Sequence, residues 1–180
     1  LNAFLLADSR TPGPRRQILS VPPLYTMEPA YLETLLTQQD VPEEERQRIA
    51  AYARVRREQI GHILSSDTVR LELPRLSAEA FAQFPPSLPL SVLFYEWDVP
   101  YTYETYLAHV RQTEAFAAAQ PHCRLEWTGG GAFRNLQICI HEGQWAMVSK
   151  GKSPAIHFVI RHPKLRTAIE RFVPPVVEVE

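Results

Sequence analysis

The sequence predicts an α+β fold, in which N-terminal helices precede a mostly antiparallel sheet with further helices packed on it. Apolar residues first recur with helical spacing, over positions 29–64. From residue 68 onward, several short runs instead alternate apolar and polar residues with the two-residue period of strands. Two of these runs flank the pair Glu142-Gly143, which is typical of a tight hairpin.

The composition is that of a globular chain with no strong charge of either sign. It has 180 residues, of which 45% are hydrophobic and 22% charged, and a formal net charge of −1. No bulk positive field is present to hold a polyanion, and no apolar run is long enough to span a membrane. Cys123 and Cys139 form no short-spacing motif, so free thiols in the cytoplasm are expected, with a single disulfide as the alternative.

The beginning of the chain predicts a linker rather than a packed element. The run "SRTPGPRR" combines helix-breaking Pro and Gly with arginine, so residues 1–16 are interpreted as a linker or the end of a preceding helix. Residues 17–180 would then form a single sensor or dimerisation domain, with a helical part over 28–66 and a sheet-rich part over 67–175. Because the sequence starts with Leu1 and not Met, we expect it to be a piece of a longer polypeptide.

Two helices are expected first. One runs from Pro29 to about Gln39, with an apolar stripe of tyrosine and leucine. The second runs from Pro42 to Leu64 and has three glutamates in its first turn, where the helix dipole favours negative charge. Its core face comprises Ile49, Tyr52, Ala53, Arg56, Ile60, Ile63 and Leu64.

Strands and shorter helices alternate in the rest of the chain. The expected helices are Ser77 to Phe84, Thr102 to Ala119 and the segment "HPKLRTAIERF". The expected strands are "TVRLELP", "LPLSVLF", "HCRLEWT", "RNLQICIH", "QWAMVSK" and "PAIHFVI". In the last helix, the buried face is expected to comprise Leu165, Ala168, Ile169 and Phe172.

The hairpin turn predicts which side chains share a face of the sheet. If Glu142 and Gly143 are its two loop residues, His141 lies opposite Gln144, and directly opposed residues point the same way. One face then carries a core set: Leu136, Ile138, Ile140, Trp145 and Met147. The other carries a mixed set: Gln137, Cys139, His141, Gln144, Ala146, Val148 and Lys150.

The mixed face is the candidate site. Burial of Ile156, Phe158 and Ile160 would turn His157 toward Gln137 and Cys139, and a few polar groups on a half-apolar surface suit a ligand floor. The following loop "SKGKSP" could meet an anion through its lysines and backbone amides. The predicted ligand-binding residues are Gln137, Cys139, Ser149, Lys150, Lys152 and His157. The same face could equally lie under a helix or a dimer partner.

No catalytic motif is found in the sequence. The six histidines lack zinc-site spacing, no GxSxG elbow occurs, and the GGG run lacks the residues of a P-loop, so no metal, cofactor or catalytic residue is expected. One enzymatic alternative remains open, a thiol or acid-base hydrolase in which Cys139 and His157 face each other on neighbouring strands. A pure protein–protein interaction module is the other alternative.

Two stretches carry a family resemblance. "FRNLQICIHEGQWAMVSKGKSPAIHFVIRHPKLRTAIERF" resembles the C-terminal regulatory half of XRE-like helix-turn-helix bacterial transcriptional regulators, and "LYTMEPAYLETLL…EEERQRIAAYARVRREQI" resembles the start of such effector domains. The resemblance covers about residues 18–175 and concerns the order of elements rather than an invariant motif.

The resemblance implies a cytoplasmic transcription factor. Its effector domain would bind a small molecule, anion or peptide, form a homodimer and contact DNA only through a domain outside this chain. For the dimer interface, the long helix from Pro42 to Leu64 is the first candidate. No membrane association is expected.

Overall fold

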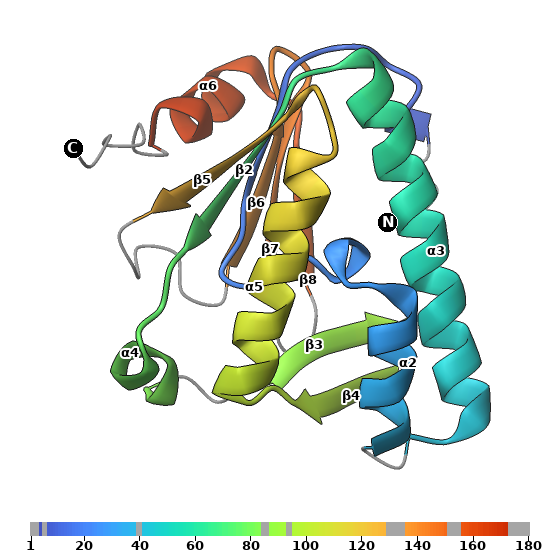
Figure 1. Ribbon diagram of the computed structural model, residues 1–180. Coiled ribbons are helices and arrows are strands. Elements are labelled where there is room, and N and C mark those ends of the chain that lie inside the picture. The colour runs from blue at the N-terminus through green and yellow to red at the C-terminus, as the bar shows by residue number, and fades with distance from the viewer. Residues whose placement is uncertain are drawn as a thin grey trace.

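The structure, a computed structural model, describes Phe4 and residues 7–38, 41–83, 87–92, 95–128, 136–150 and 156–172. The main sheet lies between α6 on one side and α3 and α5 on the other (Figure 1). In chain order the elements are β1 (Arg15–Ile18), η1 (Leu24–Thr26), α2 (Pro29–Gln38), α3 (Glu43–Ser66), β2 (Val69–Pro74), α4 (Ala78–Ala82), β3 (Ser87–Val92), β4 (Tyr95–Pro100), α5 (Tyr103–Ala118), β5 (Cys123–Thr128), β6 (Leu136–His141), β7 (Trp145–Lys150), β8 (Ile156–Ile160) and α6 (Pro163–Phe172).

The main sheet is mixed and has six strands in the order β5-β2-β1-β6-β7-β8. The pairs β1–β2 and β2–β5 are parallel, whereas β1–β6, β6–β7 and β7–β8 are antiparallel. Strands β3 and β4 form a separate antiparallel hairpin. The predicted α+β class with a mostly antiparallel sheet is therefore confirmed.

The expected linker is wrong at its C-terminal end, because Arg15 and Arg16 begin β1, an inner strand of the sheet. Arg15 is only 4% exposed and forms ion pairs with Asp8 and Asp67. Arg16 pairs with Glu72 of the neighbouring strand at 2.7 Å. The two arginines were expected to lie in a solvated segment. Instead each guanidinium is paired with a carboxylate, Arg15 with Asp8 and Asp67 and Arg16 with Glu72, which makes its burial tolerable.

The two faces of the sheet follow from its register. The helical face carries Val69 and Leu71, which pack against Ile60 and Ile63 of α3 and Phe116 of α5. The α6 face carries a second apolar group, Ile18, Ile138, Ile140 and Ala146, against which Ile169 of α6 packs. Side chains alternate between faces along each strand, so these two sets determine the face on which each remaining residue of the sheet lies.

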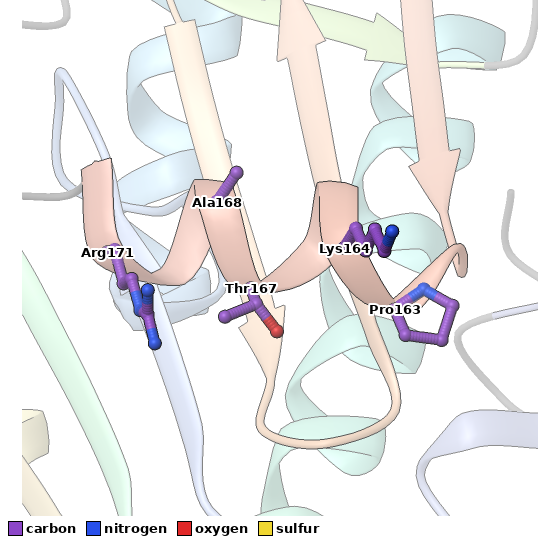
Figure 2. Close-up of a pocket in the computed structure, with 5 residues that line it drawn as sticks. All are labelled: Pro163, Lys164, Thr167, Ala168 and Arg171. Carbon is purple, nitrogen blue, oxygen red and sulfur yellow. The ribbon is translucent and has the colours of Figure 1, made fainter.

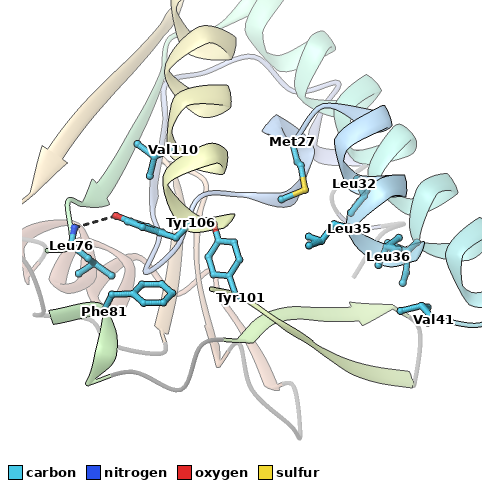
Figure 3. Packing of buried hydrophobic residues seen from close by; sticks show 11 residues of the cluster. Met27, Leu32, Leu35, Leu36, Val41, Leu76, Phe81, Tyr101, Tyr106 and Val110 are labelled. Atoms are coloured by element: carbon cyan, nitrogen blue, oxygen red, sulfur yellow. Dashed lines mark hydrogen bonds between the residues drawn. The ribbon is translucent and has the colours of Figure 1, made fainter. Parts of the chain in front are cut away.

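A further core joins α2 and α5 above the β3–β4 hairpin (Figure 3). Leu32, Leu35 and Leu36 form the buried stripe predicted for α2. Tyr106 joins this core to the end of β2, since its hydroxyl donates to Pro74 O and accepts from Leu76 N, both at 3.1 Å. The cluster explains why the aromatic residues around α5 are packed rather than exposed.

Side-chain caps stand at the starts of two predicted helices, α4 and α5. Ser77 accepts from Ala80 N at the start of α4, and Thr102 accepts from Thr105 N at the start of α5. Strand β4 was missed, although its sequence YEWDVP alternates apolar and polar residues. In α3, the expected core positions Ile49, Ile60, Ile63 and Leu64 are buried.

The predicted orientation of α6 is wrong for two of its four residues. Ile169 packs on the sheet, but Leu165 is 57% exposed and Ala168 is also exposed. The side chain of Phe172 lies outside the described part of the chain. Arg166 and Glu170, an ion pair at 3.3 Å, take the partly buried positions instead, and Arg166 donates to Gly143 O in the β6–β7 turn at 2.5 Å. These polar contacts turn the helix away from the orientation predicted by its apolar spacing.

Candidate functional site

The β6–β7 turn differs by one residue from the predicted hairpin. His141 pairs with Trp145 and Cys139 with Met147, so the loop comprises three residues, Glu142 to Gln144. Gly143, the middle residue of the loop, has φ +74°, a left-handed conformation that glycine adopts without steric cost. Gln144 N donates to His141 O at 3.0 Å to close the turn.

This register reverses the predicted faces of β7. Trp145 and Met147 lie on the helical face with Cys139 and His141, not with the isoleucines of β6. Ala146, Val148 and Lys150 point to the α6 face. A slip of one residue moves every side chain of a strand to the other side, so the predicted mixed face is wrong for the whole of β7. The assignment of Gln137, Cys139 and His157 to one face is retained.

Three predicted site residues form a row across the helical face. Gln137 of β6 pairs with Ser149 of β7, which in turn pairs with His157 of β8. His157 Nδ1 and Ser149 Oγ lie 2.8 Å apart and share a hydrogen bond. Ser149 is buried, Gln137 is half-buried and His157 is exposed on the outer strand. The row therefore extends from the interior of the sheet to its open edge, and we call it the polar row.

The electrostatics of the polar row favour neutral groups. Partial burial lowers the pKa of His157 below its ordinary value of 6.5, so the imidazole is neutral at pH 7. Its Nε2, and the Gln137 amide, make no hydrogen bond within the described part of the chain. A ligand at this position would meet an amide, a hydroxyl and a neutral imidazole, each of which can donate or accept hydrogen bonds.

The other predicted site residues lie elsewhere. Cys139 shares the helical face, but β7 lies between its strand and that of His157, so the two do not face each other on neighbouring strands. Burial raises the pKa of the Cys139 thiol to about 11, against a smaller opposite influence of Arg56. Lys150 lies on the α6 face, opposite Leu136 and Ile156. Lys152 falls outside the described residues.

Polar residues that sequence reasoning missed continue from the polar row toward β1. Gln17 of β1 pairs with Cys139 and accepts a 2.8 Å hydrogen bond from the Tyr25 hydroxyl. Gln59 of α3 is 2% exposed and accepts from Arg56 at 2.7 Å. Burial raises the Tyr25 pKa, while Arg56 opposes the shift. Sequence reasoning missed Gln17 because β1 was not predicted: Arg15 and Arg16 were assigned to the end of a linker, and no strand was expected at residues 17–18.

Two further buried networks have a structural character. Asp8 accepts hydrogen bonds from Trp145 Nε1 at 2.6 Å and His141 Nδ1 at 2.8 Å, and it pairs with Arg15. His109 lies between Tyr101 and the carbonyl of Pro23, at 2.9 and 3.1 Å. Asp8, His141 and His109 are all inaccessible to solvent or nearly so, which leaves no room for a substrate.

A hollow of about 360 Å³ lies along α6, on the opposite side of the sheet from the polar row (Figure 2). It is lined by Pro163, Lys164, Thr167, Ala168 and Arg171. The described residues contain no group of three or more His, Cys, Asp or Glu side chains that could hold a metal ion. No helix in the described ranges is long and apolar enough to cross a membrane.

The thiols of Cys123 and Cys139 are free, as predicted. Their strands, β5 and β6, are separated by β2 and β1, so a disulfide between them is excluded by this topology. Comparison of the chain with protein-family models, with curated proteins and with solved structures finds no match.

Proposed function

We propose that this chain is the signal-sensing and dimerisation domain of a cytoplasmic bacterial transcriptional regulator. It binds a small polar molecule at the polar row and controls a DNA-binding domain outside this chain. The observation that carries the ligand proposal is the row itself: Gln137, Ser149 and His157 aligned across three strands, reaching the sheet edge. The regulatory role rests on the family resemblance.

The composition of the polar row favours an uncharged ligand over an anion. Neither predicted lysine supports an anion site here, because Lys150 lies on the α6 face and Lys152 is outside the described residues. The row offers neutral donors and acceptors, which suit a hydroxyl, amide or carbonyl compound. The regulatory step would be a population shift, in which the ligand binds one arrangement of the domain more tightly than another.

A thermal-shift screen of polar metabolites tests this proposal. A ligand present at a hundred times its Kd stabilises the folded state by about 2.7 kcal/mol, which corresponds to a Tm increase of about 5–10 °C for a domain of this size. The increase should be lost in Gln137→Ala and His157→Ala. The matched control is His162→Ala, which removes an exposed imidazole just after β8. The proposal would be contradicted if no compound stabilises the protein, or if a compound stabilises all three variants equally.

A protein–protein interaction module is the second candidate, favoured by the exposed apolar side chains of β8. In that case alanine at His157 and Lys150 weakens association, and ligand screens remain blank. The hydrolase alternative loses its support, because the Cys139 thiol stays protonated at neutral pH and has no histidine opposite it.

A further inference from the structure

Exposed apolar side chains concentrate on one strand, β8. Three of the five large apolar side chains that are exposed among the described residues lie in β8: Ile156, Phe158 and Val159. Phe158 is the most exposed, at 62%. The other two, Val55 and Leu165, lie on α3 and α6. Single exposed apolar residues are ordinary, whereas a contiguous group marks an interaction surface.

The backbone of β8 is also available for pairing. Within the described part of the chain it is the last strand of the sheet and bonds only to β7. Side chains on both of its faces are exposed: Val159 and His157 on the helical face and Phe158 on the α6 face. Natural edge strands are normally protected by charge, proline or a bulge. The five residues of β8 are Ile, His, Phe, Val and Ile, and they include no charged side chain and no proline.

We propose that β8 pairs antiparallel with β8 of a second copy of this chain, joining the two sheets across a twofold axis. Pairing all five residues of each strand places the axis at Phe158, the central residue. Phe158 then faces its own copy, Ile156 faces Ile160, and His157 faces Val159. The apolar residues of the α6 face thus meet apolar residues, which is the self-complementarity that a twofold interface requires.

Charge and area are consistent with this partner. The strand brings no like charges into opposition, and the guanidinium of the next residue, Arg161, lies over the Phe4 ring of its own chain, with 5.5 Å between the guanidinium carbon and the ring centroid.

 The three exposed apolar side chains of β8 supply on the order of 250 Å² per copy, from typical side-chain areas. A stable dimer buries about 800 Å² per copy, so backbone pairing and flanking residues must supply the rest. We therefore expect a dimer that dissociates in the micromolar range.

The dimer would also complete the polar row, an extension that rests on the proposed function. His157 lies on the helical face at the edge, next to the position of the partner's Val159. The two His157 side chains become diagonal neighbours across the axis, within about 7–8 Å. A ligand bound at one polar row would then contact residues of both copies, which links ligand binding to dimerisation.

Oligomeric state tests the interface without reference to any ligand. The mass of the whole chain is measured by light scattering or sedimentation over about 1–200 μM, a range that brackets a micromolar Kd. Wild type should shift from monomer to dimer, and Phe158→Asp should remain monomeric. Val55→Asp, which changes an exposed apolar residue outside the group, should dimerise normally. A wild type that stays monomeric, or a dimer lost in Val55→Asp and kept in Phe158→Asp, would overturn the proposal.

Disulfide trapping tests the pairing of the strands. Under mild oxidation Phe158→Cys should form a covalent dimer, because the residue faces itself across the axis. Ile156→Cys should not, since the two copies of residue 156 would lie about 13 Å apart along the strands. Wild type controls for Cys123 and Cys139. Absence of a Phe158→Cys dimer, or equal trapping at position 156, would overturn antiparallel pairing. Because no ligand is present, this result is independent of the sensing proposal.

Discussion

The imidazole of His109 is fully buried between α5 and the segment around η1, and the geometry identifies its protonated nitrogen. Nε2 lies 3.1 Å from Pro23 O, which can only accept, so Nε2 carries the hydrogen. Nδ1 then accepts from the Tyr101 hydroxyl at 2.9 Å. Burial lowers the His109 pKa to about 4, so the ring is neutral throughout the physiological range.

This histidine should make the protein less stable in acid. The unfolded chain protonates His109 near pH 6.5, whereas the folded chain does so only near pH 4. The contribution of neutral His109 to the free energy of unfolding is therefore fully present above pH 6.5. It is lost as the pH falls toward 4, by about 3 kcal/mol in total. Urea unfolding of wild type and His109→Gln between pH 7 and pH 4 measures the difference. The variant should show a smaller pH dependence.

His162→Gln, at an exposed position, is the control and should keep the wild-type pH dependence. His157, whose pKa is also lowered by burial, leaves a residual slope in His109→Gln. An unchanged slope in His109→Gln would mean that this imidazole is not the group that couples folding to pH.

At the scale of elements, two glycines with positive φ define separate turns. Gly143, at φ +74°, lies in the β6–β7 loop, and a Cβ there would meet nothing within 4 Å. Gly13, at φ +147°, lies just before β1, and a Cβ there would be 2.6 Å from His141 Nε2. The first site is constrained by backbone conformation alone, whereas the second is constrained by conformation and by a close approach to a buried ring.

Alanine at these two positions should therefore have unequal effects. Gly143→Ala is expected to cost about 1 kcal/mol, the conformational penalty for a left-handed residue. Gly13→Ala should cost more, because it also displaces His141 from Asp8 and from the carbonyl of Pro12. Chemical denaturation of both variants measures the difference. Equal losses would show that the close approach at Gly13 is relieved at little cost.

The same elements show how far the sequence predicted the structure. Helices α2, α3 and α5 and the strands of the C-terminal half were predicted because their apolar periodicity and caps are local signals. The face assignment of β7 failed because one extra loop residue, Gln144, changes the register, and both loop lengths are compatible with Glu142-Gly143. The orientation of α6 failed because Arg166 bonds to a carbonyl in that same loop, which no local pattern reveals.

For the molecule as a whole, the least predictable feature was the insertion of β1 into the sheet. Its position depends on contacts between distant segments: Arg15 with Asp67, and Asp8 with His141 and Trp145. The candidate site was predicted only in part, because it too depends on contacts between segments that are distant in sequence. Local alternation correctly placed Gln137 and His157 on one face. Ser149 was expected in a loop and reaches that face only through the observed register of β7. The positions of Gln17 and Gln59 beside the sheet depend on the tertiary structure.

The Asp8 network should contribute strongly to global stability. Asp8 is buried and pairs with Arg15, which is 4% exposed, so Asp8→Ala leaves a buried guanidinium with one carboxylate partner, Asp67, and removes an acceptor from Trp145. Removing one member of a buried ion pair typically costs about 3–5 kcal/mol. By contrast Glu44→Ala breaks a solvent-exposed pair with Arg48 and should cost less than about 1 kcal/mol.

Urea unfolding of the two variants at pH 7, followed by far-UV circular dichroism, gives the comparison. The larger loss in Asp8→Ala is expected because water cannot replace the lost carboxylate around Arg15, whereas it solvates Arg48 on the surface. Equal, small losses in both variants would mean that Asp67 and the carbonyls of Gly13 and Thr11 satisfy Arg15 by themselves. In that case the N-terminal segment would be joined to the sheet mainly by apolar contacts, such as that of Phe4 with Trp145.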